Sequence, residues 1–271
     1  MSFTFVTALY NISREQYDQR SYQQYQTWFE RTLSIPVPMV IFTEICNEDI
    51  VKRARSKYDN ITKVIYTSLD EVPFYYTVDT VRDIITNSPF KRRIQHPNGL
   101  ENKCFGYIPI IHSKYAWMNK AIESNYFNSD MFFWIDAGLS RFLNFDIADG
   151  HFNNPLISQI HNENKIFIQL GKVNEFAKVL NNELSFYDAV GKNINFMMAG
   201  FWGGNSSLMM EVCKIGEKMY IEDLIGKQQV DNEQVTFGFI LKQYKHNLLC
   251  TFPCNVECIN YYVFCDKVTI S

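Results

Sequence analysis

The segment Met131-Phe132-Phe133-Trp134-Ile135-Asp136-Ala137-Gly138 joins an unbroken apolar run to a carboxylate followed by two small residues. Such a run is typical of a central strand that is covered on both faces. In open α/β sheets ligands gather at the carboxyl ends of the strands, where Asp136 would lie. A carboxylate there suits a divalent cation that binds a diphosphate, because hard cations prefer oxygen ligands. An aspartate after a strand can equally be a helix cap or a turn residue.

Strand and helix patterns alternate before this segment. β-branched and aromatic residues predict strands, and apolar residues at helical spacing predict helices. The strands are expected at 3–10, 38–44 and 62–67, with helices within 15–33 and 47–58. This alternation predicts an α/β fold in which helices flank a mostly parallel, Rossmann-like sheet with right-handed crossovers.

The second half continues the same fold. A helix over 113–123 leads into the strand before Asp136, and Lys114 lies at its start. Further strands are expected at 165–170 and 260–264. No internal repeat, low-complexity segment or linker interrupts the chain, so residues 1–271 are predicted to form one domain.

Composition excludes several classes of protein. The 271 residues are 46% hydrophobic and 20% charged, with a net charge of −3, which is ordinary for a soluble globular protein. Lys and Arg are dispersed, so no nucleic-acid-binding surface is expected. No apolar run reaches the length of a transmembrane span, and no signal peptide is recognisable. Seven scattered cysteines fit a reducing compartment, and a cytoplasmic location is expected.

A glycine-rich stretch lies at 195–207. Gly200, Gly203 and Gly204 surround the pair Phe201-Trp202 and come just before a predicted helix. Glycine lets the backbone approach a ligand closely, so this stretch is a candidate binding loop whose aromatic rings face a sugar. A purely structural turn would have the same composition.

The last candidate residues surround a predicted helix that runs to about residue 244. Asp231 and Glu233 lie at its start, and either could act as a base or nucleophile. Acids in a first helical turn are also expected from capping and the helix dipole alone. His246 follows the helix. A single histidine is more often an ordinary surface or core residue, although imidazole is a common metal ligand.

Several motifs that mark known classes of enzyme are missing from the sequence. The chain contains no G-x-G-x-x-G, G-x-x-x-x-G-K-[ST], H-E-x-x-H or G-x-S-x-G sequence. Motif support is therefore missing for dinucleotide oxidoreductases, P-loop enzymes, zincins and α/β-hydrolases.

The order of these features resembles the GT-A glycosyltransferases and, more closely, the HtrL/YibB family, which is associated with bacterial surface-glycan loci. The resemblance runs from residue 3 to about residue 246. Four short segments carry it: Val6–Arg14, Trp28-Phe29, Pro38–Thr43 and Phe133–Gly138.

The resemblance implies a nucleotide-sugar site. Asp136 would occupy the place of the D-x-D motif that binds Mn²⁺ or Mg²⁺ and the diphosphate, although Gly138 stands where the second acid usually lies. His246 would correspond to a late histidine that completes metal coordination in some members. The edge of the first strand would hold the nucleotide through Thr7, Ala8, Tyr10 and Arg14, with Lys114 as a further phosphate ligand.

The resemblance also implies an activity. The loop from Gly200 to Gly204 would line the donor sugar and acceptor. Asp231 or Glu233 would be the general base of an inverting transfer, with Asp231 favoured and Glu233 as the alternative. The expected function is sugar transfer from a nucleoside-diphosphate sugar, with UDP-sugar favoured, to a glycan or other hydroxyl acceptor. A nucleotidyltransferase and a catalytically silent glycan-binding module are the alternatives, because a fold alone does not determine function.

Overall fold

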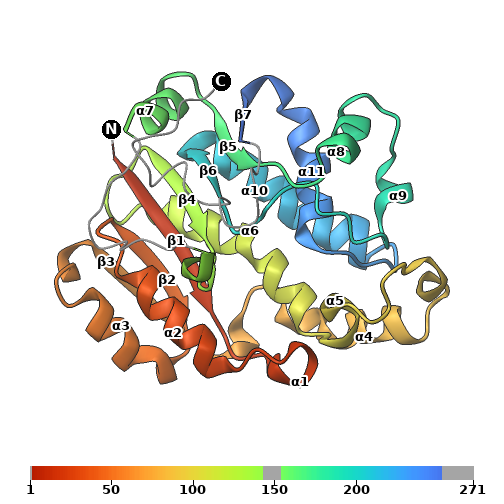
Figure 1. The fold of residues 1–271 in the computed structure, drawn as a ribbon, viewed down its shortest axis with the longest axis horizontal. Coiled ribbons are helices and arrows are strands. Elements are labelled where there is room, and N and C mark those ends of the chain that lie inside the picture. The colour runs from red at the N-terminus through yellow and green to blue at the C-terminus, as the bar shows by residue number, and fades with distance from the viewer. Residues whose placement is uncertain (1, 143–153, 252–271) are drawn as a thin grey trace.

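The computed structural model describes residues 2–142 and 154–251, which build a seven-stranded sheet with helices on both faces (Figure 1). The strand order is β3-β2-β1-β4-β6-β5-β7, and every strand except β6 runs in the same direction. The strands are β1 (Phe3–Leu9), β2 (Met39–Thr43), β3 (Thr62–Tyr66), β4 (Met131–Ile135), β5 (Ile166–Gln169), β6 (Phe201–Asn205) and β7 (Leu248–Thr251). The α/β fold with a mostly parallel sheet flanked by helices, as expected from the sequence, is confirmed.

Two hydrophobic layers enclose the sheet, because the central strands are apolar on both faces. One layer packs α2, α3 and α7 against side chains such as Phe5, Phe133 and Phe201. The other packs α6, α10 and α11 against residues that include Trp134 and Trp202. The helices are α1 (Glu15–Asp18), α2 (Tyr22–Leu33), α3 (Glu48–Arg55), α4 (Val78–Thr86), α5 (Leu100–Lys103), α6 (Tyr107–Ser124), α7 (Asn154–Asn162), α8 (Val173–Leu180), α9 (Phe186–Ala189), α10 (Ser206–Lys218) and α11 (Glu233–Gln243).

The segment 15–33 is two helices rather than one. Gln19 adopts a left-handed conformation with φ 63° and ends α1. Ser21 then begins α2 with a capping box, in which its side chain accepts a hydrogen bond from the backbone N–H of Gln24 and the Gln24 side chain accepts one in return. The break separates residues 10–21 from α2, and this segment directly follows β1.

The glycine-rich stretch was predicted to be a loop, and this prediction is wrong for residues 201–205, which form β6. The strand lies between β4 and β5 and is antiparallel to both. A Cβ atom on Gly203 would lie 2.3 Å from the carbonyl oxygen of Phe132, and one on Gly204 would lie 2.4 Å from that of Lys165. These glycines therefore allow the neighbouring strands to pack closely.

The sheet has a topological switch point between β1 and β4. From β1 the chain proceeds to β2 and β3 on one side, and then returns to β4 on the other side of β1. The loops that follow the carboxyl ends of β1 and β4 consequently diverge and leave a crevice between them.

The predicted strand at 260–264 lies outside the described residues. None of the helices within 2–142 and 154–251 has the length and apolar character that a membrane span requires.

Candidate active site

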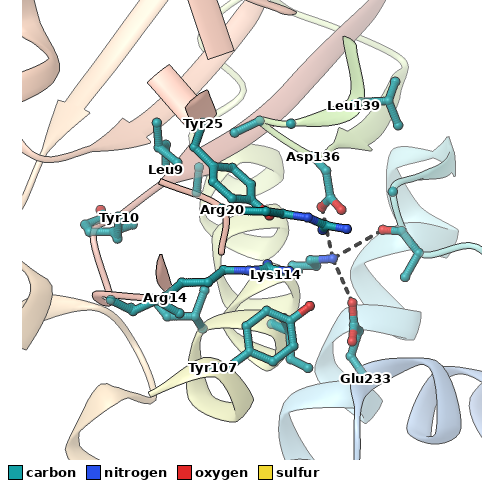
Figure 2. A pocket seen from close by; sticks show the side chains of 18 of the residues that line it. Leu9, Tyr10, Arg14, Arg20, Tyr25, Tyr107, Lys114, Asp136, Leu139 and Glu233 are labelled. Atoms are coloured by element: carbon teal, nitrogen blue, oxygen red, sulfur yellow. Dashed lines mark hydrogen bonds and ion pairs between the residues drawn. The ribbon is translucent and has the colours of Figure 1, made fainter. Parts of the chain in front are cut away.

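A cavity of about 290 Å³ opens at this switch point. The loop after β1 contributes one wall, the loop after β4 another, and α6 and the start of α11 close the base (Figure 2). A stack of aromatic rings supports the cavity from below: Tyr10 lies 5.5 Å from Trp117, which lies 5.9 Å from Trp134, and both pairs are nearly parallel. The cavity therefore has a rigid apolar support and polar groups directed into it.

Lys114 joins two carboxylates at the base of the cavity. Its Nζ lies 3.0 Å from Asp136 Oδ1 and 2.7 Å from Glu233 Oε1, and it donates a hydrogen bond of 3.3 Å to the carbonyl oxygen of Ala199. Figure 2 shows these three contacts converging on the ammonium group. An ammonium has three donors, so Lys114 is fully satisfied within the protein.

The two carboxylates differ in their access to the cavity. The side chain of Glu233 is 8% exposed, whereas that of Asp136 is 38% exposed. Asp136 Oδ1 also accepts a hydrogen bond of 2.7 Å from the Trp134 indole. Trp134 and Asp136 are two residues apart, which brings both side chains to the same face of an extended chain.

Burial and neighbouring charges have opposite effects on the pKa values of Lys114 and Glu233. Burial alone would lower the pKa of Lys114, but the negative charges of Asp136 and Glu233 outweigh it and raise the pKa above its usual range. Burial raises the pKa of Glu233, and Lys114 only partly offsets this effect. Lys114 therefore stays charged, while Glu233 binds a proton more readily than an exposed glutamate.

Guanidinium groups also line the cavity, from Arg14, Arg20 and Arg141. Figure 2 shows Arg14 between the rings of Tyr25 and Tyr107, and the Arg20 side chain reaching toward Asp136. The centre of the Arg14 guanidinium lies 5.2 Å and 5.1 Å from the Tyr25 and Tyr107 rings. The cavity therefore combines a lysine-paired acid cluster with three arginines.

A family model described as "Bacterial protein of unknown function (HtrL_YibB)" matches residues 1–251. The chain belongs to the HtrL_YibB family. No curated protein matches it. Since the family description assigns no activity, the function of this HtrL_YibB chain has to be inferred from its own residues.

Two solved structures resemble the chain over most of its length. The apo form of mouse xyloside xylosyltransferase 1 is 10% identical, covers 93% of this chain and 85% of its own, and has a TM-score of 0.48. A 4-diphosphocytidyl-2C-methyl-D-erythritol synthase from Anaerococcus prevotii is 10% identical, covers 94% of this chain and 90% of its own, and has a TM-score of 0.43.

Seven of the predicted site residues of this HtrL_YibB chain line the cavity. They come from five separate segments and meet at the carboxyl edge of β1 and β4: Ala8, Tyr10, Arg14, Lys114, Asp136, Gly200 and Glu233. Tyr10 contributes its ring, because its hydroxyl is hydrogen-bonded to the Thr67 hydroxyl at 2.6 Å.

Five other predicted residues belong to the core or to the sheet. Thr7 is completely buried in β1. Phe201 packs against Phe5 and Phe133, and Trp202 packs against Phe237. Neither aromatic side chain faces the cavity, since both are more than nine-tenths buried among apolar groups. Gly203 and Gly204 lie beside them in β6.

Asp231 lies away from the cavity although it is only two residues from Glu233. Its carboxylate accepts hydrogen bonds from the backbone N–H groups of Gly191 at 2.7 Å, Asn193 at 3.4 Å and Asn232 at 2.7 Å. These bonds hold a turn in which Gly191 has φ 93°. Asp231 therefore holds that turn, and the favoured base does not line this cavity, whereas Glu233 does.

Few free ligand atoms remain for the expected Mn²⁺ or Mg²⁺ ion. Asp136 Oδ1 is already engaged by Lys114 and Trp134, and Glu233 is engaged by Lys114. His246 is exposed just before β7, at the opposite end of the sheet from Asp136. Within 2–142 and 154–251, no three His, Cys, Asp or Glu side chains are grouped so as to hold a metal ion.

Sequence reasoning did not identify Arg20, Arg141, Tyr25 and Tyr107. Arg141 follows shortly after β4, and Arg20 lies beyond α1 in the connection between β1 and α2. For Arg141, this position after a strand that ends at the switch point was the available signal. Tyr25 lies in α2, within the range where a helix was expected. Its role as a support for Arg14 depends on the fold.

Proposed function

We propose that this chain transfers a sugar from a nucleoside-diphosphate sugar, with UDP-sugars the first class to test, to a hydroxyl group of a glycan or other acceptor. The observation that carries the proposal is the buried Lys114, which holds Asp136 and Glu233 together in a cavity that three arginines also line. Sugar transfer requires both the acids and the cations. Positive charge is needed at the leaving diphosphate and negative charge at the anomeric carbon.

The reaction breaks the bond between the anomeric carbon and the phosphate oxygen, and the diphosphate leaves with the electron pair. The acceptor oxygen forms the new bond to the anomeric carbon, and its proton passes to Glu233. A base whose pKa lies near the working pH is the most effective, and burial moves the pKa of Glu233 in that direction. Direct displacement of this kind inverts the anomeric configuration.

Lys114 and Asp136 support this transfer without reacting. When Glu233 takes the proton, Lys114 retains an ion pair with Asp136 and is not left as an unpaired buried charge. Asp136 is the more exposed carboxylate, so it is placed to stabilise positive character on the anomeric carbon. Loss of Lys114 would leave two neighbouring carboxylates that repel each other.

The test is a thermal-shift screen of nucleotide-sugars, followed by analysis of the products. A ligand that binds only the folded chain raises its melting temperature. The proposal expects one nucleotide-sugar to stabilise the protein and to be converted to a nucleoside diphosphate, with the sugar on an acceptor or, slowly, on water. If no nucleotide-sugar binds or reacts, the proposal is wrong.

Two further measurements distinguish the alternative functions. Release of pyrophosphate from a nucleoside triphosphate and a sugar phosphate would identify a nucleotidyltransferase. Binding of a glycan without binding of any nucleotide would identify a silent glycan-binding module.

A further inference from the structure

We infer that Arg14, Arg20 and Arg141 bind the diphosphate of the donor directly, so that this site binds its nucleotide without a divalent cation. The inference rests on the proposed function and adds how the charge of the leaving group is neutralised. Guanidinium groups suit this task because their planar N–H edges match phosphate oxygens and can donate two hydrogen bonds at once.

Arg14 is held in place with part of its guanidinium still available. Its Nε donates to Asp18 Oδ2 at 2.6 Å, and its plane is supported by Tyr25 and Tyr107. Within the described part of the chain, its two Nη atoms donate no hydrogen bond. The ion pair with Asp18 thus fixes one edge of the group and leaves the other edge for a ligand.

Arg141 is supported in a similar way from the other loop. Its guanidinium centre lies 5.4 Å from the Trp28 ring and 4.3 Å from the Phe142 ring, and Nη1 donates to the carbonyl oxygen of Gly138 at 3.3 Å. Stacking of this kind fixes the orientation of the group but satisfies few of its five donors.

The charges of the three arginines are close enough to influence one another. Burial lowers the pKa of Arg141, and Arg20 and Arg14 lower it further, while Tyr25 and Asp136 act in the opposite direction. Arg20 is exposed, with its Nε 4.0 Å from the Asp18 carboxylate. Asp136 and Glu233 also line the cavity, but they are paired with Lys114. Among the described residues, Asp18 is the one carboxylate within ion-pair distance of these three arginines, so their guanidinium groups keep donors for an anionic ligand.

Arg141 also occupies the space of the missing second acid. A Cβ atom added to Gly138 would lie 2.7 Å from Arg141 Nη1 and 3.1 Å from Cε1 of Tyr25. An aspartate at position 138 would therefore displace the arginine. The place where the D-x-D pattern puts a metal-binding carboxylate contains a cationic side chain in this fold.

The experiment is calorimetric titration of the full chain with UDP and, separately, with inorganic pyrophosphate, each in excess EDTA and again with Mn²⁺ or Mg²⁺. The expected result is the same dissociation constant under both conditions. Arg14→Gln and Arg141→Gln should each weaken binding in EDTA by roughly 10- to 100-fold, as loss of charged hydrogen bonds predicts. Arg14→Lys should restore little, because an ammonium lacks the planar fork.

Two further variants are titrated in the same way: Arg20→Gln as a third test of the cavity and Arg92→Gln as a control. Arg20 is exposed, so its replacement leaves folding intact, and it should also weaken binding in EDTA. Arg92 is exposed and lies outside the cavity, so Arg92→Gln should bind like the wild type. Binding that needs Mn²⁺ or Mg²⁺, or binding that survives all three substitutions in the cavity, would overturn the inference while leaving sugar transfer possible. A chain that binds and converts no nucleotide-sugar under either condition would overturn the proposed function itself.

Discussion

Asp231 and Glu233 are separated by one residue, yet they lie in different environments. Asp231 is surrounded by backbone N–H groups that belong to the turn at Gly191, and it lies outside the main cavity. Glu233 begins α11, lines the cavity and is paired with a buried lysine. Both residues are acids at nearly the same position in the sequence, so the groups that each carboxylate contacts decide its role. A carboxylate bound to backbone donors fixes a loop, whereas one paired with a side chain at a cavity can exchange a proton.

The sharpest test of this comparison is turnover of Glu233→Gln. Glutamine keeps the shape and an oxygen that can accept from Lys114, but it cannot take a proton. Turnover of the donor should fall by roughly 10²–10⁴-fold, with donor affinity close to that of the wild type. Steady-state kinetics and calorimetry measure the two quantities. Asp231→Asn is the matched control, and an equal loss of turnover in both variants would remove the distinction.

Removal of the lysine should have the next largest effect, on stability. Lys114→Met leaves Asp136 and Glu233 without their common partner, so the free energy of unfolding should decrease by about 3–5 kcal/mol. Denaturant titration measures this change. The double variant Lys114→Met/Glu233→Gln should recover part of the loss, because one of the two unpaired charges is gone. A double variant as unstable as the single one would contradict the role given to Lys114.

Asp231→Ala should destabilise the chain by a smaller amount. The change leaves the N–H groups of Gly191, Asn193 and Asn232 without their acceptor, and a buried unsatisfied donor costs about 1–3 kcal/mol. Turnover below the melting temperature should stay near that of the wild type. A normal melting curve combined with lost turnover would show that Asp231 acts in the reaction.

A pH dependence of stability should also come from Asp231. Burial raises its pKa to about 7 from an ordinary value of 3.8, against the opposing effect of the three N–H donors. The folded state therefore binds more protons than the unfolded state between these values, and stability falls as pH rises through this range. The difference in unfolding free energy between the wild type and Asp231→Asn should decrease from pH 4 to pH 7. A constant or rising difference would contradict the raised pKa.

The sheet was predictable because its strands are short apolar runs. Met131–Ile135 was recognised as a buried strand, and the rule that ligands gather at carboxyl ends then placed Asp136 correctly at the cavity. The early βαβαβ pattern likewise predicted that β1, β2 and β3 are parallel. Such inferences need only local pattern and the geometry of parallel sheets.

The contacts of the site were not predictable, because they join residues that are distant in the chain. Glu233 lies 119 residues after Lys114, and no local pattern reports their ion pair. β6 was missed because glycine is unfavourable in strands in general, whereas here it is needed where neighbouring backbones approach closely. Trp202 shows the same limit, since an aromatic residue beside glycines suits a binding loop and a tightly packed central strand equally well.

The stacking of Arg14 between Tyr25 and Tyr107 also has a consequence for the rate and entropy of binding. A free arginine side chain has about 2 kcal/mol of rotamer entropy to lose when it is immobilised. Here the two rings and Asp18 immobilise the guanidinium as the chain folds, before any ligand arrives. An anion would then meet a receptor that is already ordered, so its association should be limited by diffusion rather than by rearrangement of the site.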